Sequence, residues 1–424
     1  MNTIQRMGRK LLLKLAGSQT VLWRLSVFIA IVIAVSIAFN FSQRLPYPPG
    51  MDQDWYLENG RNFAEHFVFM WRTPVYSSWV GTIYLLCGSD IKTTFFVEKI
   101  IAVVLLSLLV CWLGWKVLDK WTGLLMAIWV WNCKYLLLET NGSHTLAASL
   151  FVLSLLCLYL PVEFARTPMA MLMLFLSGMC RLEMRVVVAL VIGYLLVKYF
   201  RKWRRGNGIE KAIAHKELLA WVMLVFIATG LYLLFMTRVS TLEPSIPAHA
   251  FKQNFAANYV ERKGLSDKYQ DAWRQNPMIW SEALPGATTP IDALIKYPGE
   301  VMGHFYWNLR LFIRALPANV LAFYHPLPML LLFGLWAWVC LVTGKSGDGP
   351  VFKLDAQKLL PGWLTAVLVL IPISIVLRVA ARYYQQLIVV EMVVLLAIAR
   401  VAITYLKKAW LGDKAEACGG RAFQ

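Results

Sequence analysis

Two carboxylates, Asp52 and Asp54, follow the first long apolar stretch of the chain and are separated by a single glutamine. Carboxylates at the edge of a membrane-embedded site could take part in acid–base chemistry. Aspartate is also among the best N-cap residues of a helix, so each side chain could instead have only a structural role. The pair marks a candidate site whose chemistry depends on the elements that position it.

The segment after the aspartates predicts a short amphipathic helix that ends before Pro74. One face would carry Tyr56, Gly60, Phe63, Ala64 and Phe67, and the other Glu58, Arg61, Asn62 and Glu65. Such a pattern is typical of a helix that lies on a membrane surface. Arg72-Thr73-Pro74 should end this helix and begin the next, because proline disfavours helix in the preceding residue and is well tolerated at the first helical position.

The composition predicts an all-α polytopic membrane protein. Of the 424 residues, 59% are hydrophobic and only 16% are charged, which is too apolar for a soluble domain. The net charge of +18 comes from lysines and arginines beside apolar runs, so it indicates topology signals and anionic lipid contacts rather than nucleic acid. The seven cysteines show neither a disulfide framework nor metal-ligand spacing.

The apolar runs predict about ten membrane crossings within a single domain, residues 1–424. At about 20 residues per crossing, we expect spans at 21–41, 93–117, 121–138, 144–160, 168–181, 184–200, 217–237, 320–342, 359–377 and 384–405. The first is a retained anchor rather than a signal peptide. The short apolar segment 74–88 is expected to be re-entrant or interfacial. The distribution of lysine and arginine places both termini in the cytoplasm.

Two outer loops follow from this topology. The first, residues 42–92, carries the aspartates. The second, residues 239–319, is the larger and predicts helices at 249–263 and 266–276, followed by an aromatic-rich stretch at 293–313 that lies on the membrane surface. The second loop is more typical of a lid than of a separate catalytic domain.

Charged and polar residues from distant segments map to the outer leaflet. They are Glu98, Lys99, Lys134, Glu139, His144, Arg181, Glu183, Arg185, Arg378, Arg382 and, about two turns deeper, Glu391. Charges inside a bilayer are costly, so their common depth predicts one polar cavity that opens outward. The alternatives are that the basic side chains snorkel to the interface and that Glu391 and Lys134 form a structural ion pair.

Several short motifs resemble the multispanning C-type (GT-C) glycosyltransferases, which include protein O-mannosyltransferases and the lipid A aminoarabinose transferase. The motifs are Asp52-x-x-x-Tyr56, Ala64, Arg72 with Pro74, Tyr297-Pro298 and Arg382-Tyr383. Two features depart from the family pattern. Gln53 separates acids that are often adjacent in relatives. A second acid is common in the family's next outer loop, where this sequence offers Glu139 and His144.

The resemblance implies transfer of a sugar from a polyprenyl phosphate to an acceptor hydroxyl outside the membrane. Asp52, or alternatively Asp54, would be the general base of an inverting reaction. Arg181, Arg185, Arg378 and Arg382, with Tyr383, would bind the departing phosphate, and Tyr56, Arg72, Glu139 and His144 would contact substrate. Some relatives use a divalent metal ion, but this sequence does not indicate one.

Two other functions fit parts of the pattern. An O-antigen polymerase or ligase would use outward arginines without the first-loop acids, and a transporter or flippase of lipid-linked sugars would place charges in both leaflets. Clustering in the outer leaflet favours the enzyme. We expect a bacterial inner membrane protein whose partners are the lipid-linked sugar donor, membrane lipid and a glycan or lipid acceptor of the envelope such as lipopolysaccharide, with the endoplasmic reticulum as the alternative location.

Overall fold

The computed structural model describes residues 51–68, 73–133, 142–181, 208–237, 246–321 and 388–403, with scattered residues between 184 and 204 and between 329 and 337. Within these ranges the chain forms helices joined by turns and contains no strand, which confirms the predicted all-α class. The described helices are α3 (Met51–His66), α4 (Pro74–Leu86), α5 (Ile91–Val117), α6 (Lys120–Asn132), α8 (Gly142–Cys157), α9 (Glu163–Cys180), α11 (Gly208–Thr237), α12 (Ile246–Lys263), α13 (Asn276–Ala283), α14 (Pro290–Lys296) and α15 (Pro298–Leu321).

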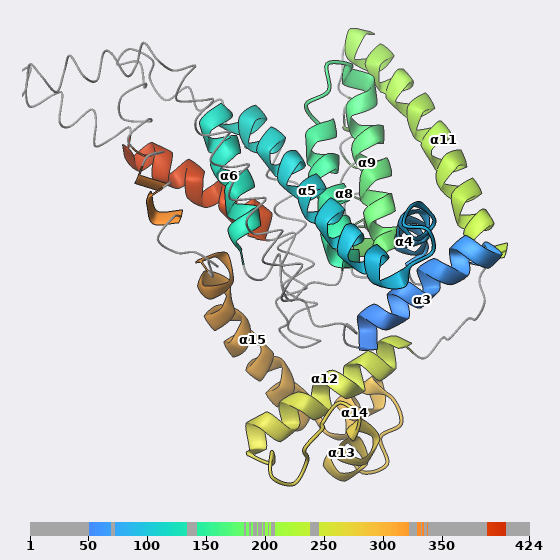
Figure 1. Ribbon diagram of the computed structural model, residues 1–424, viewed down its shortest axis with the longest axis vertical. Helices are drawn as coiled ribbons and strands as arrows, with labels where there is room; N and C mark the ends of the chain where they lie inside the picture. The colour runs from blue at the N-terminus through green and yellow to red at the C-terminus, as the bar shows by residue number, and fades with distance from the viewer. Residues whose placement is uncertain are drawn as a thin grey trace, which may run out of the picture.

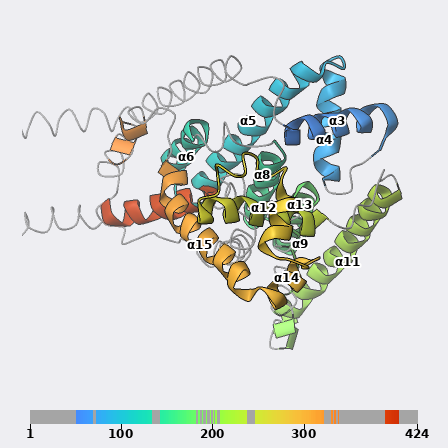
Figure 2. The same cartoon turned by 90° about the horizontal axis from the view of Figure 1, so that it is seen from below.

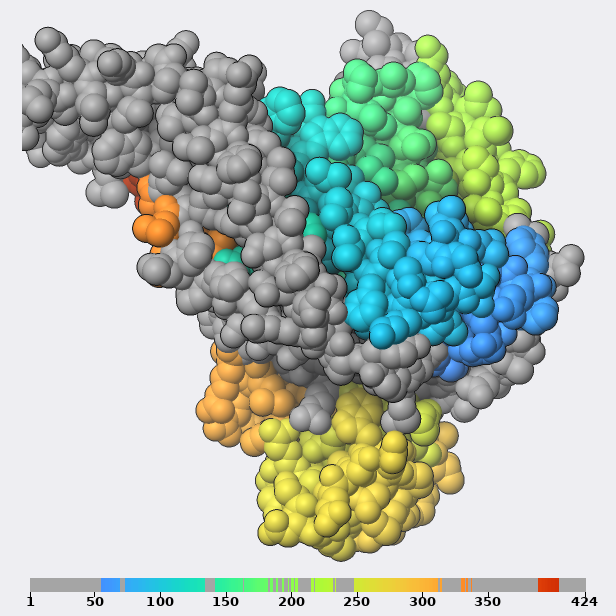
Figure 3. Space-filling view, in the orientation of Figure 1, coloured from blue at the N-terminus to red at the C-terminus, as the bar shows by residue number. Residues whose placement is uncertain are grey.

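The helices form a bundle and a smaller lobe (Figure 1). The bundle contains α5, α6, α8, α9 and α11, and α3 and α4 lie at one of its ends. The lobe contains α12, α13, α14 and the start of α15, and it projects from the same end of the bundle (Figure 3). Seen from below, the lobe lies in front of the ends of α8 and α9 (Figure 2).

The predicted amphipathic helix is α3. Its inner face buries Tyr56, Leu57 and Gly60, and ion pairs from Arg61 to Glu58 and Glu65 lie on its outer face. Phe67 was expected on the buried face, but it follows the end of the helix with a φ of 53° and is 45% exposed. The next helix, α4, begins at Pro74 as predicted. Seen along its axis in Figure 1, α4 runs across the direction of α8 and α9.

Two glycines allow α3 and α4 to pack unusually closely. A Cβ atom at Gly60 would lie 2.7 Å from Cβ of Val80, and one at Gly81 would lie 2.6 Å from the Gly60 carbonyl oxygen. Side chains at either position would therefore push the two backbones apart. Small residues have the same effect at helix interfaces within membranes. The contact fixes α3, and the aspartates at its start, against the bundle.

The bundle is held by close helix contacts and by capped helix ends. Asp90 caps α5 by accepting hydrogen bonds from the backbone N–H groups of Lys92 and Thr93, and Asp119 caps α6 in the same way. A Cβ atom at Gly114 would lie 2.7 Å from Cα of Gly123, so α5 and α6 also pack nearly backbone to backbone. Large apolar side chains such as Leu106, Met126 and Trp129 fill the space between these helices and α8.

One described helix, α5, is long and apolar enough to cross a membrane. Three shorter apolar stretches, Gly142–Cys157, Phe164–Cys180 and Leu218–Leu231, coincide with other predicted spans. The predicted spans 21–41 and 359–377 lie outside the described residues. The segment 388–403 is helical and packs on the core of α5 and α6 through Ile388, Met392 and Leu396, and Arg400 forms an ion pair with Asp119.

The lobe has its own apolar core, in which Phe255, Trp280, Leu284 and Ala293 are buried. The helix expected at 249–263 is α12, but the helix expected at 266–276 is wrong. Gly264 ends α12 with a φ of 66°, and residues 265–275 form turns that bury Tyr269. The expected stretch 293–313 also divides into α14 and α15, because Pro298 disfavours helix at Tyr297.

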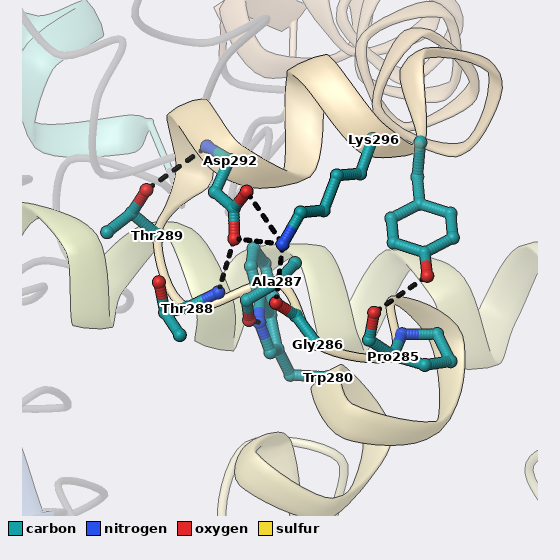
Figure 4. Close-up of polar contacts among 9 residues, drawn as sticks. Trp280, Pro285, Gly286, Ala287, Thr288, Thr289, Asp292 and Lys296 are labelled. Carbon is teal, nitrogen blue, oxygen red and sulfur yellow. Dashed lines mark hydrogen bonds and ion pairs between the residues drawn. The ribbon is translucent and has the colours of Figure 1, made fainter.

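A network of hydrogen bonds closes the turn between α13 and α14 (Figure 4). The Asp292 carboxylate accepts hydrogen bonds from the Thr288 N–H at 2.9 Å and from the Lys296 amine at 3.1 Å. The first of these bonds is the main reason that the pKa of Asp292 lies below its usual range. The Trp280 indole N–H donates to the carbonyl oxygen of Ala287 at 2.7 Å. The bonds of Asp292 and Lys296 tie α14 to the turn that precedes it.

Candidate functional site

The ends of five helices meet where α3 lies on the bundle. Tyr56 of α3, Tyr76 of α4, Phe95 of α5, Ala147 of α8 and Cys180 of α9 belong to one buried cluster. Buried polar side chains, among them Glu98, Ser143 and His144, lie on the same helix ends. The candidate site is therefore built from the starts of α3, α4, α5 and α8 and from the end of α9.

Tyr56 and Arg181 connect α3 to the end of α9. A guanidinium nitrogen of Arg181, Nη1, donates a hydrogen bond of 3.0 Å to the Tyr56 hydroxyl, although 125 residues separate them in sequence. The Tyr56 ring is 7% exposed and packs edge to face on Tyr76, with 5.2 Å between the ring centroids. The backbone of Arg181 follows the last turn of α9 and donates to the Ser177 carbonyl oxygen. The arginine is thus held against Tyr56, which lies one helical turn after Asp52 on α3.

Glu98 is completely buried between α4, α5 and α8. Its carboxylate contacts Gly142, the first residue of α8, where a Cβ atom would lie 2.5 Å from Cδ of the glutamate. Tyr76 and Trp79 are close enough to interact with the carboxylate. Neither oxygen has a partner with standard hydrogen-bond geometry in the described part of the chain. The N-terminal end of a helix stabilises negative charge, so α8 favours an anion at this position.

The neighbours of Glu98 are also polar and buried. Lys99 is 7% exposed, and its amine lies 5.7 Å from the centroid of the Phe95 ring. Ser143 and His144 continue α8 directly after Gly142 and are at most 1% exposed. An acid, an amine, an imidazole and a guanidinium are therefore concentrated at one end of an otherwise apolar bundle. Such groups could bind an anionic or hydroxyl-rich ligand and exchange protons with it.

The structure brings together four of the residues predicted to bind substrate. Tyr56, His144 and Arg181 all lie at this end of the bundle. Arg185 lies close to Arg181 and donates from Nε to the Gly178 carbonyl oxygen at 3.1 Å. Glu98 and Lys99 lie at the same end, so residues from distant segments share one end of the bundle. Their depth in a membrane stays a prediction.

Of the other predicted site residues, the structure describes only the backbone of Asp52 and Asp54. Asp52 and Asp54 belong to the first residues of α3, inside the helix rather than before it, so neither occupies the position of an N-cap. Their side chains are outside the described part of the structure, and so are all of Arg72, Glu139, Arg378, Arg382 and Tyr383. The roles assigned to these residues stay predictions.

Glu98 and Tyr76 were not among the predicted site residues. A glutamate inside a long apolar helix is a signal that the sequence contains, and Glu98 was noted as a charge at the start of a span. Its neighbours on α4 and α8 could not be found this way, because no local pattern connects residue 98 with residues 76 and 142. Among the described residues, no group of three or more histidine, cysteine, aspartate or glutamate side chains could hold a metal ion.

Comparisons with known proteins gave no match to a family model, to a curated protein or to a solved structure. The function must therefore be inferred from the residues themselves.

Proposed function

We propose that the chain is an integral membrane glycosyltransferase that moves a sugar from a polyprenyl-phosphate donor to an acceptor hydroxyl outside the membrane. The observation that carries the proposal is the position of Arg181. This arginine is held by Tyr56 at the same end of the bundle as Asp52, Glu98 and His144. A carboxylate near a fixed guanidinium supplies the two groups that the reaction needs, a base for the acceptor and a cation for the leaving phosphate.

Each group has a defined task in this reaction. Asp52, with Asp54 as the alternative, accepts the proton of the acceptor hydroxyl as its oxygen attacks the anomeric carbon. The bond from that carbon to the phosphate oxygen breaks, and the guanidinium of Arg181 donates hydrogen bonds to the phosphate as its charge develops. One attack with one base inverts the anomeric configuration. Arg382 and Tyr383 are proposed to bind the same phosphate.

The membrane setting is part of the same proposal. The proposed protein has about ten spans, cytoplasmic termini and an outward-facing site, and it lies in a bacterial inner membrane. The apolar helix α5 supports it, as do the exposed apolar side chains of α11, among them Leu219, Val225 and Phe226, which are 59–73% exposed. An exposed apolar face of this size is costly in water and favourable in lipid.

The test is sugar transfer from a radiolabelled polyprenyl-phosphate sugar by the purified protein in proteoliposomes. Asp52→Asn should lower transfer about 10²- to 10⁴-fold, as loss of a general base does. Asp267→Asn, which changes an exposed aspartate in the lobe, is the matched control and should keep full transfer. Arg181→Ala and Arg382→Ala test the two sites proposed for the phosphate.

Other outcomes would favour the other functions. If Asp52→Asn and Asp54→Asn both keep full transfer, the first-loop acids are structural, and a polymerase or ligase that depends on the arginines becomes the better hypothesis. If the wild-type protein moves the lipid across the bilayer without transferring its sugar, the chain is a flippase and the enzyme proposal is refuted.

A further inference from the structure

The outer face of α15 carries a continuous apolar stripe. Met302, Tyr306, Leu309 and Ile313 are 56%, 69%, 37% and 61% exposed. Their spacing of four, three and four residues places them on one face of the helix. At 1.5 Å per residue the stripe is about 16 Å long. Four large apolar side chains in a row on a surface need an apolar partner.

The opposite face of α15 is fixed to the lobe by polar contacts. Asn258 of α12 donates hydrogen bonds of 3.0 Å to Nδ1 of His304 and 2.7 Å to the side-chain oxygen of Asn308. All three side chains are at most 1% exposed. Glu300 forms ion pairs with Arg262 and Lys263 of α12. Because buried polar groups lose these partners if α15 rotates, the apolar stripe cannot turn inward.

The helix before α15 adds to the apolar surface. Ile291 and Ile295 of α14 are 72% and 74% exposed, one turn apart. The two charged residues of α14 do not cover this apolar surface. Asp292 and Lys296 form an ion pair with each other and hydrogen bonds to the turn at 286–289 (Figure 4). The outward side of α14 is therefore apolar as well.

Two arginines mark the chemistry of the partner. Arg310 directly follows Leu309, and Arg314 directly follows Ile313. Each arginine is therefore rotated by about 100° around the helix axis from a stripe residue, and both lie along the same edge of the stripe. Both are exposed, and the guanidinium of Arg310 lies 5.3 Å from the centroid of the Trp307 ring. Neither forms an ion pair with an acid in the described part of the chain. An apolar stripe with cations along one edge matches the boundary between acyl chains and phosphate headgroups.

We infer that the stripe Met302–Tyr306–Leu309–Ile313 inserts into the outer surface of the bilayer and that Arg310 and Arg314 bind the phosphates of anionic lipids. This contact would hold the lobe against the membrane surface, near the end of the bundle that carries the candidate site. The inference rests on the membrane setting of the proposed function but not on the reaction that the bundle catalyses.

Photo-crosslinking of the full chain in nanodiscs tests the inference. Benzoylphenylalanine is placed singly at positions 306, 309 and 313, and at the exposed turn position 267 as the matched control. The discs contain phosphatidylcholine and phosphatidylglycerol. We expect lipid adducts at the three stripe positions and none at position 267, as identified by mass spectrometry. An unchanged melting temperature for each labelled chain shows that the label leaves the fold intact.

The charge of the lipid is tested in the same discs. Arg310→Ala combined with Arg314→Ala should lower the ratio of phosphatidylglycerol to phosphatidylcholine adducts by up to about 30-fold, since each basic residue near an anionic surface contributes about a fivefold preference. Adducts between two chains, or equal lipid adducts at positions 267 and 309, would overturn the inference. Because no result depends on sugar transfer, failure here is separate from failure of the proposed function.

Discussion

Replacing Gly142 with alanine tests the contact that defines the buried end of the candidate site. The new methyl group would lie 2.5 Å from Cδ of Glu98, whereas ordinary contacts of a Cβ atom begin at 3.4 Å. Either the carboxylate or the start of α8 must therefore move by at least 3.4 − 2.5 = 0.9 Å. Glu98 is completely buried, so it has no solvent to move into. Overpacking of this kind costs about 1–3 kcal/mol.

The assay is the half-life of the folded full chain in one detergent at one temperature, because membrane proteins of this size commonly unfold irreversibly. If the clash raises the free energy of the folded state alone, a cost of about 1–3 kcal/mol shortens the half-life by about 5- to 150-fold. Gly230→Ala is the matched control, since no atom lies within 4 Å of a Cβ atom at this position of α11. The control should be neutral or slightly stabilising.

A double variant separates the clash from other effects of alanine. Glu98→Ala removes the group that the methyl would meet, so Gly142→Ala should cost much less stability in that background than in the wild-type protein. The reasoning is refuted if Gly142→Ala is as long-lived as Gly230→Ala. It is also refuted if the loss of half-life is equal in both backgrounds, because α8 would then be sensitive to alanine for a reason unrelated to Glu98.

Three further predictions concern other contacts. Tyr56→Phe removes the hydrogen bond that Arg181 donates to the Tyr56 hydroxyl. Because a hydrogen bond to a charged group contributes about 1.5–3 kcal/mol, sugar transfer should fall about 10- to 150-fold. The helix content measured by circular dichroism should stay unchanged. Asp119→Asn keeps the cap of α6 and weakens only the partly exposed ion pair with Arg400, whereas Asp119→Ala loses both contacts. The melting temperature of Asp119→Asn should therefore lie between those of the wild-type protein and Asp119→Ala. Equal melting temperatures for the two variants would contradict the capping role. Folding lowers the pKa of Asp292, so the stability that this carboxylate contributes is complete above its unfolded pKa of about 3.9 and is lost as the pH falls through its folded pKa. The difference in melting temperature between the wild-type protein and Asp292→Asn should accordingly shrink below about pH 4, and a constant difference would contradict this.

The sequence by itself determined most of the helices. The apolar run at 93–117, the amphipathic pattern after Asp54 and the proline at position 74 correspond to α5, α3 and the start of α4. These features depend on interactions within a few residues, namely helical periodicity and the restricted backbone of proline, so they can be recognised locally. The same restriction at Pro298 separates α14 from α15 within the expected stretch 293–313.

Only the tertiary structure decided where the chain between α12 and α13 forms turns. The charged residues at 266–276 are compatible with a helix, and nothing local contradicts one. In the folded lobe Tyr269 is buried between α12 and α13, and its hydroxyl donates a hydrogen bond of 2.5 Å to Glu282. Burial of this ring outweighs the weak helical preference of the segment, because such preferences amount to a few tenths of a kcal/mol per residue.

The candidate site shows the same division between local and long-range information. The types of its residues could be predicted, since charges in apolar segments stand out in any sequence. The contacts of these residues could not be predicted. Tyr56 contacts Arg181 across 125 residues of sequence, and no helical or strand periodicity relates Glu98 to Gly142. Contacts of this kind depend on how whole helices pack, and close packing is decided by the shapes of all the side chains between them.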